Sequence, residues 1–259
     1  MMRLEGRVAL VTGGGRGIGR AAALALAREG ARVAVAARTR EDLQSTTSEI
    51  AASGGEALPL ACDVSSKQSV ESVVEALVAR WGGADIVVNA AGDAVSAPLA
   101  RTTDDVWERM LAVNLTGTFL VTRAFVPQMV ERGWGRVVNI ASTAGRVGFP
   151  YVSAYCASKH GVVGFTRAVA IEVAAKGVTV NAVCPGYVDS DMTLRSIDNI
   201  VRTTGRTPQE ARQALLASNP QGRLVAPEEV AHLVLMLCQP ESAGINGQAI
   251  VLDGGAIQA

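Results

Sequence analysis

A glycine-rich turn near the start of the chain constrains the fold most strongly. It reads Thr-Gly-Gly-Gly-Arg-Gly-Ile-Gly from Thr12 to Gly19, directly after an apolar run at residues 8–11 and directly before a helical pattern. Glycines let the backbone approach a pyrophosphate, and the amino end of the helix attracts its negative charge. A glycine turn between a strand and a helix therefore predicts a dinucleotide site, although the spacing of Gly13, Gly17 and Gly19 is not G-x-G-x-x-G.

Apolar runs of strand length alternate with helical patterns along the whole chain. Strands are predicted at residues 8–11, 31–37, 57–62, 85–89, 136–142, 178–183 and 248–252. Helices are predicted at residues 21–27, 70–81, 104–130, 155–174, 208–218 and 227–238. This alternation predicts an α/β fold, in which residues 1–259 form one Rossmann-like domain with a doubly wound sheet of seven parallel strands and helices on both faces.

One segment, at about residues 187–222, breaks the alternation, because it contains polar helical pieces and no predicted strand. It begins after Pro185 and Gly186, at the carboxyl end of a strand, where ligands bind to open parallel sheets. A long excursion at that place predicts a substrate loop or lid. The alternative is a structural excursion that covers the sheet.

Charge and cysteine usage exclude several other classes of function. The chain has 24 basic and 24 acidic side chains, so no surface for nucleic acid or an anionic membrane is expected. Its cysteines, at positions 62, 156, 184 and 238, are far apart, and with two histidines in the chain they predict neither a disulfide framework nor a metal site. Without a signal-peptide core or a run of about 18 apolar residues, we expect a cytoplasmic protein.

The end of the second predicted strand indicates which dinucleotide binds. An acidic residue there would bind the ribose 2′-hydroxyl of NAD, but the chain reads Ala-Ala-Arg-Thr-Arg from Ala36 to Arg40. Arg38 is suited to pair with a 2′-phosphate, and Arg16 in the glycine turn adds a second positive charge. We therefore expect NADP(H) to be preferred, with NAD(H) as the alternative because Glu41 could reach a ribose.

Two further strand ends meet the same edge of the sheet. Asp63, which follows the third strand together with Val64, is predicted to accept a hydrogen bond from the adenine amino group. Residues 89–92, Asn-Ala-Ala-Gly, end the fourth strand with small side chains, where a ligand or a helix must come close. For Asn89, a structural role that ties adjacent strands together is an equal alternative to ligand contact.

Tyr155 and Lys159 lie four residues apart in a predicted helix, so their side chains stack on one face. A nearby ammonium favours the phenolate, and the pKa of Tyr155 is predicted to fall from about 10 toward neutrality. A tyrosine tuned in this way gives a proton to a carbonyl oxygen or takes one from an alcohol. The alternative is a surface tyrosine and lysine with no mutual role.

These motifs together resemble the short-chain dehydrogenase/reductase family over essentially the whole chain. The resemblance rests, in chain order, on Thr12, Gly13, Gly17, Gly19, residues 89–92, Asn114, Ser142, Tyr155, Lys159, Pro185 and Gly186. The chain departs from the family pattern at Ala90, where a second asparagine is usual, and at Ser190, where threonine is frequent.

The resemblance implies a catalytic tetrad. Tyr155 would be the acid/base, and Ser142 would hold the substrate oxygen beside it. Lys159 would lower the pKa of the tyrosine and hold the nicotinamide ribose, while Asn114 would support a water that links Lys159 to solvent. Two hydroxyl donors would stabilise the charge that develops on a ketone oxygen, and the cofactor would supply the hydride.

The motifs and the resemblance together predict a set of ligand contacts and no metal ligands. The predicted cofactor contacts are Gly13, Gly15, Arg16, Gly17, Ile18, Gly19, Arg38, Thr39, Asp63, Val64, Asn89, Ala90, Ala91, Gly92, Tyr155, Lys159, Pro185, Gly186, Val188 and Ser190. The predicted substrate contacts, mostly apolar, are Ser142, Ala144, Phe149, Tyr155, Tyr187 and Met192.

Within the family the chain looks most like ketoreductases of acyl chains. That implies interconversion of an apolar ketone, such as a 3-oxoacyl thioester of CoA or acyl-carrier protein, and the secondary alcohol. An NAD-dependent 3-hydroxyacyl or alicyclic alcohol dehydrogenase and a dinucleotide-binding regulator without turnover are the alternatives. The resemblance also implies a homotetramer built on the helices at residues 104–130 and 155–174, with the strand at 248–252 in a second interface.

Overall fold

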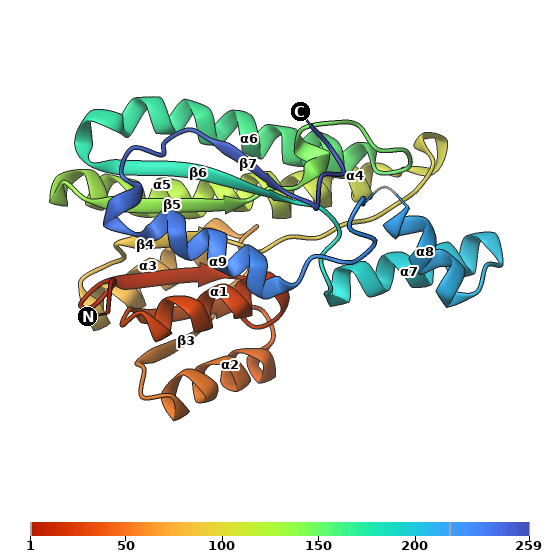
Figure 1. Cartoon of the computed structure of the whole chain (residues 1–259). Helices are drawn as coiled ribbons and strands as arrows, with labels where there is room; N and C mark the ends of the chain where they lie inside the picture. Colours follow the sequence, from red (N-terminus) through yellow and green to blue (C-terminus); the bar gives the residue numbers. More distant parts are fainter. Residues whose placement is uncertain (1, 218, 259) are drawn as a thin grey trace.

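The computed structural model describes residues 2–217 and 219–258 and places seven strands in one parallel sheet (Figure 1). The strands are β1 (Val8–Thr12), β2 (Arg32–Ala37), β3 (Ala57–Ala61), β4 (Ile86–Asn89), β5 (Gly135–Ile140), β6 (Val178–Pro185) and β7 (Ala249–Leu252). Their order is β3-β2-β1-β4-β5-β6-β7, and every neighbouring pair is parallel. The chain thus reverses its direction of winding between β1 and β4, which is where such sheets bind ligands. The predicted fold class is confirmed.

Helices cover both faces of the sheet because the central strands are apolar on both sides. The helices are α1 (Gly17–Arg28), α2 (Arg40–Ala52), α3 (Lys67–Trp81), α4 (Asp104–Met110), α5 (Gly117–Arg132), α6 (Ser153–Val173), α7 (Asp191–Thr204), α8 (Pro208–Leu216) and α9 (Pro227–Cys238). Ala9 and Val11 of β1 pack with α1, α2 and α9, whereas Val8 and Leu10 pack with α3, α5 and α6. Side chains alternate between faces along a strand, so a continuous apolar run fills both layers.

The helix predicted at residues 104–130 is present but contains a π-helical turn, Leu111–Thr116, between α4 and α5. By length and composition alone, Asp104–Arg132 is apolar enough to cross a membrane. Its side chains Phe125 and Met129 are fully buried among β strands and α3, as expected for the core helix of a globular domain. The π turn buries Asn114, and π turns of this kind are frequent at functional sites.

Residues 187–222 carry α7 and α8, which project beyond the carboxyl ends of the strands (Figure 1). These two helices have a small core of their own, formed by Ile197, Ala211 and Leu215. A single parallel bridge, from Val188 to Val225, ties the start of the segment to the chain that leaves it. The predicted helix at 208–218 ends at Leu216, and Ser218 lies outside the described residues.

Candidate active site

A cavity of about 980 Å³ opens at the carboxyl ends of the strands, and α7 forms part of its wall. Every predicted cofactor and substrate contact lines this cavity except Asn89. Of the predicted tetrad, Ser142, Tyr155 and Lys159 line it, whereas Asn114 is buried behind the wall. The fold therefore brings motifs from the whole length of the chain to one place.

The glycine turn packs tightly against the end of β4. Gly13 has a φ of 66°, and a Cβ there would lie 2.7 Å from the backbone nitrogen of Ala91. A Cβ at Gly19 would lie 2.2 Å from the carbonyl oxygen of Gly13. Because both positions exclude a side chain, the turn brings the amino end of α1 to the cavity wall, in the arrangement that a pyrophosphate site requires.

The end of the cavity beyond β2 carries charges of both signs. Arg38 is exposed there, beside Asp63. Hydrogen bonds from Ser65 hold the pKa of Asp63 below its ordinary value, and the charge of Arg38 contributes to the same shift. Glu41, the predicted alternative ligand for a ribose, is not among the lining residues, whereas Asp42 in the first turn of α2 is.

Asn89 ties the central strands together. Its Nδ2 donates to Asn139 Oδ1 at 2.8 Å and to Thr122 Oγ1 at 3.0 Å, joining β4 to β5 and α5. The side chain is 3 % exposed and faces the core. The structure therefore does not support the predicted cofactor contact for Asn89 and favours the structural alternative.

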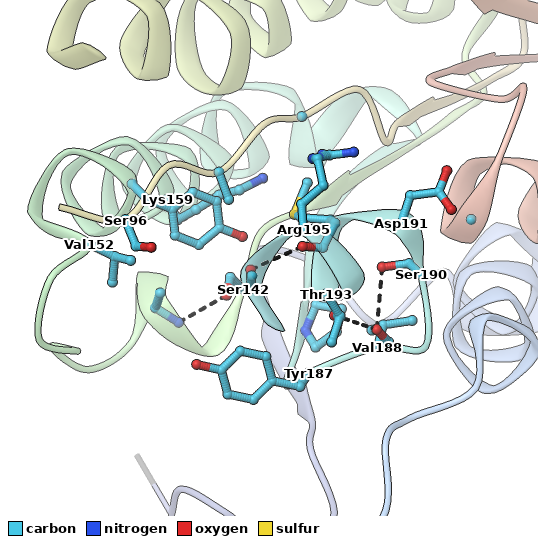
Figure 2. Close-up of a pocket in the computed structure, with 18 of the residues that line it drawn as sticks. Ser96, Ser142, Val152, Lys159, Tyr187, Val188, Ser190, Asp191, Thr193 and Arg195 are labelled. Carbon is cyan, nitrogen blue, oxygen red and sulfur yellow. Dashed lines mark hydrogen bonds between the residues drawn. The ribbon is translucent and has the colours of Figure 1, made fainter. Parts of the chain in front are cut away.

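Ser142, Tyr155 and Lys159 gather in one wall of the cavity. Ser142 Oγ accepts a hydrogen bond from the backbone nitrogen of Ala144 at 3.1 Å, so its own proton is left to donate toward Tyr155 or into the cavity. Lys159 Nζ donates to the carbonyl oxygen of Ile140 at 2.8 Å and lies 5.7 Å from the centre of the Tyr155 ring. Figure 2 shows Ser142 and Lys159 on the side of the pocket away from Ser190 and Asp191.

Asn114 stands directly behind this wall. Its Nδ2 donates to Ser158 Oγ and to the carbonyl oxygen of Asp93, both at 3.0 Å, and its Oδ1 accepts from the backbone nitrogen of Asp93 at 2.9 Å. A Cβ on Gly92 would lie 3.2 Å from Asn114 Oδ1 and 3.6 Å from Lys159 Nζ. The amide oxygen and the lysine amine therefore approach the same point above Gly92, which glycine keeps open.

Comparison with known proteins identifies the family that builds such a site. The family model for short chain dehydrogenases matches residues 7–200. This chain is a short-chain dehydrogenase. The family resemblance predicted from the motifs is thereby confirmed, and so is the prediction that the chain is an oxidoreductase.

Relatives of this dehydrogenase match it over nearly their full length. It is 38 % identical over 256 residues to the 3-oxoacyl-acyl-carrier-protein reductase FabG of Thermotoga maritima, covering 99 % of this chain and 100 % of the relative. It is 37 % identical over 252 residues to the D-beta-hydroxybutyrate dehydrogenase of Rhizobium meliloti, covering 96 % and 98 %. The crystal structure of a single-substitution variant of actinorhodin polyketide ketoreductase with NADPH superposes with a TM-score of 0.93 at 43 % identity, covering 96 % and 97 %.

The pKa values of the tyrosine and the lysine correct one sequence-based prediction. The pKa of Tyr155 was expected to fall, but burial raises it to about 12, against a smaller lowering by a hydrogen bond with Ser142. Burial also lowers the pKa of Lys159 to about 8. Burial penalises the phenolate and the ammonium alike, and this desolvation is the largest cause of both shifts. Tyr155 in this dehydrogenase is a neutral phenol at neutral pH, and Lys159 is mostly charged below pH 8.

This depressed lysine pKa makes the stability of the dehydrogenase depend on pH. Between about 8 and 10.5 the unfolded chain keeps the Lys159 proton that the folded chain has lost, so the contribution of Lys159 to stability rises with pH, whereas buried Cys62, Cys184 and Cys238, with raised pKa values, contribute in the opposite direction and are shared by both proteins compared below. We expect the wild type to gain up to about 1 kcal/mol per pH unit relative to Lys159→Met between pH 8 and pH 9.5. Urea unfolding at fixed protein concentration measures this, and parallel pH profiles for the two proteins would contradict it.

Sequence patterns missed Ser96, Asn199 and Tyr151 in the substrate half of the cavity, whereas Arg195 is one of several arginines that the sequence offers as a contact for a CoA or phosphopantetheine group. Ser96, Arg195 and Asn199 line the cavity, and Asn199 Nδ2 donates to Ser96 Oγ at 2.7 Å across 103 positions of chain. Tyr151 also lines it with a φ of 67°, a conformation that costs free energy outside glycine. None of these residues belongs to a motif. The sequence offers one hint, which is that the polar residues Arg195 and Asn199 are four positions apart and would therefore lie on one face of a helix.

Proposed function

We propose that this short-chain dehydrogenase uses NADP(H) to interconvert a ketone, preferably a 3-oxoacyl thioester, and the secondary alcohol, with Tyr155 as acid/base. The observation that carries the proposal is the meeting of Ser142, Tyr155 and Lys159 in one wall of a cavity that begins at the glycine turn. Its mostly apolar substrate half, with Phe149, suits an acyl chain.

Each side chain of the wall has a definite task in this scheme. The bound dinucleotide supplies the hydride. The hydroxyls of Ser142 and Tyr155 donate to the carbonyl oxygen and stabilise the negative charge that grows there. Lys159 holds the ribose hydroxyls, and Asn114 orients a proton path from Lys159 toward solvent.

The protonation state of Tyr155 supports the direction of reduction. A phenol with a pKa of about 12 carries its proton at neutral pH and gives it readily to an alkoxide, which is a much stronger base. Oxidation of an alcohol would instead need the phenolate, which the buried wall disfavours. We therefore propose that ketone reduction is the faster direction near neutrality.

The cofactor preference rests on the arginines at the end of β2. Arg38 and Arg16 line the cavity where a 2′-phosphate would sit, and the ketoreductase structure at TM-score 0.93 was solved with NADPH. Asp42 lines the same region and could accept from a ribose 2′-hydroxyl. That carboxylate, together with the similarity to a D-beta-hydroxybutyrate dehydrogenase, supports the second candidate, an NAD-dependent 3-hydroxyacyl dehydrogenase.

The substrate class is tested by a panel of β-keto thioesters, cyclic ketones and secondary alcohols, each assayed with both cofactors. We expect the highest kcat/KM for a β-keto thioester with NADPH. A preference for a secondary alcohol with NAD⁺ would establish the second candidate instead.

We also propose a cytoplasmic homotetramer. Large apolar side chains stand partly or fully exposed on α5 and α6, including Phe119 at 37 % and Ile171 at 81 %. Phe119 meets Phe165 edge-on at 6.1 Å, so the two helices share an aromatic surface. Light scattering is expected to give four times the chain mass of 26.8 kDa, and a monomer would contradict the assembly.

A further inference from the structure

Asp93 occupies a junction that no motif predicts. It follows Gly92 at the end of the β4 turn, and its side chain is 14 % exposed. Its carboxylate bonds Arg109 of α4 through Oδ2 and pairs with Arg195 of α7 at 3.8 Å through Oδ1. One carboxylate therefore joins α4 to α7, and α7 forms part of the cavity wall.

The main chain of Asp93 makes hydrogen bonds to both the oxygen and the nitrogen of the Asn114 side-chain amide. The N–H of Asp93 donates to Asn114 Oδ1 at 2.9 Å, and its C=O accepts from Asn114 Nδ2 at 3.0 Å. Arg109 belongs to the helix that continues into the π turn of Asn114. Asp93 thus holds Asn114 directly through its main chain and indirectly through its carboxylate.

Helix α7 reaches the same segment with a second side chain. Asn199 lies one turn after Arg195 and donates to Ser96 Oγ at 2.7 Å, and Arg202 fixes its amide by donating to Asn199 Oδ1 at 2.6 Å. Arg195 and Asn199 together clamp α7 onto residues 93–96. The cavity is lined by Ser96 as well as by Val152 and Lys159 (all labelled in Figure 2), so the clamped segment is part of its wall.

We propose that Asp93 is a positioning residue that couples closure of α7 over the substrate to the orientation of Asn114. This rests on the proposed function, because it assigns Asn114 the role in proton transfer given above. When α7 is closed, Arg195 shares the carboxylate with Arg109 and the 93–96 segment is held at both ends. When α7 opens, only the ion pair with Arg109 remains. The main-chain hydrogen bonds from Asp93 then hold the Asn114 amide less firmly.

Four single variants separate the two links. Arg195→Met removes the link to α7 and is expected to raise the KM of the ketone about fivefold and to lower kcat about threefold, because Asn114 is then held less firmly. Arg109→Met removes the link to the helix of Asn114 and is expected to lower kcat about fivefold with little change in KM. Asp93→Asn breaks both links and is expected to raise the KM of the ketone and to lower kcat. Asp93→Glu keeps the charge and is expected to restore part of both changes.

A double variant tests the coupling itself. Adding Arg195→Met to Asp93→Asn is expected to raise KM no further, because the contact is already broken. Glu71→Gln is the matched control, since it neutralises an acid in the exposed pair Lys67–Glu71 on α3, 3.5 Å apart and away from the cavity, and it should change neither parameter. Additive effects, or losses in all variants that follow only their melting temperatures, would overturn the proposal.

Backbone hydrogen exchange separates this proposal from the proposed function. Amides of α7 are expected to exchange at least threefold faster in Asp93→Asn than in the wild type or Glu71→Gln. If the wild type reduces no carbonyl compound, the proposed function fails while the exchange result still reports the clamp. If the wild type is active and α7 exchanges at the same rate in all three proteins, the clamp is contradicted.

Discussion

Replacing Tyr155 by phenylalanine is expected to lower kcat for ketone reduction by about 10²–10⁴-fold, the usual contribution of a positioned acid. The phenol donates the proton that the substrate oxygen receives, and phenylalanine keeps the shape of the ring without that proton. Cofactor affinity should change by less than about threefold, because the glycine turn and Lys159 remain. Steady-state kinetics and fluorescence titration with NADPH measure the two quantities separately.

Tyr187→Phe is the matched control for Tyr155→Phe, because it removes a hydroxyl from another tyrosine of the same cavity. Tyr187 also lines the cavity, and burial also raises its pKa, but it lies on the substrate side at the start of the 187–222 segment. We expect its loss to change the KM of the ketone by less than about tenfold and to leave the order of magnitude of kcat intact. If Tyr155→Phe retained activity near that of the wild type, Tyr155 would not be the proton donor.

Replacing Arg38 by aspartate is expected to invert the cofactor preference. A charge-assisted hydrogen bond contributes about 1.5–3 kcal/mol, and aspartate replaces that attraction by repulsion of the 2′-phosphate while offering an acceptor to a ribose hydroxyl. The ratio of kcat/KM for NADPH to that for NADH should therefore fall by about 100-fold or more. Kinetics with both cofactors at fixed ionic strength measure the ratio.

Arg40→Asp is the matched control, with the same change of charge two residues away. Arg40 begins α2, is exposed and does not line the cavity, so only its long-range field reaches the phosphate. For Arg40→Asp, the ratio of kcat/KM for NADPH to that for NADH should stay within about threefold of the wild-type ratio. Equal effects of the two variants would show that Arg38 acts through general charge and makes no contact.

The sequence predicts the sheet well because most of its strands can be recognised from their own residues, without knowledge of the rest of the fold. The strands β1, β2, β4, β5 and β6 are short, mostly apolar runs that are largely buried, and such runs are typical of strands covered on both faces. The edge strand β3 is also a mostly apolar run, although it is partly exposed. Helix α2 gives no comparable signal, since its sequence is polar and only Leu43, Thr46, Thr47 and Ile50 are buried. The π turn within Asp104–Arg132 is also invisible, because one extra residue barely disturbs the apolar pattern.

The candidate site also has features that the sequence predicts and features that it does not. Glycines and the Tyr155–Lys159 spacing are local features, and the structure brings them to one cavity. The direction of the Tyr155 pKa shift could not be predicted, because it depends on burial by residues remote in the chain. Asn89 and Asp93 show the same limit, since their partners, Asn139 and Arg195, lie 50 and 102 positions away.

The most direct test of the account follows NADPH consumption by the purified full chain with a 3-oxoacyl thioester, with analysis of the product. The account predicts that oxidation of NADPH saturates with thioester and yields one 3-hydroxyacyl thioester for each NADPH consumed, and that Tyr155→Phe binds NADPH without consuming it. A wild-type chain that binds NADPH tightly but oxidises none of it with any ketone would contradict the account and would instead indicate a dinucleotide-binding regulator.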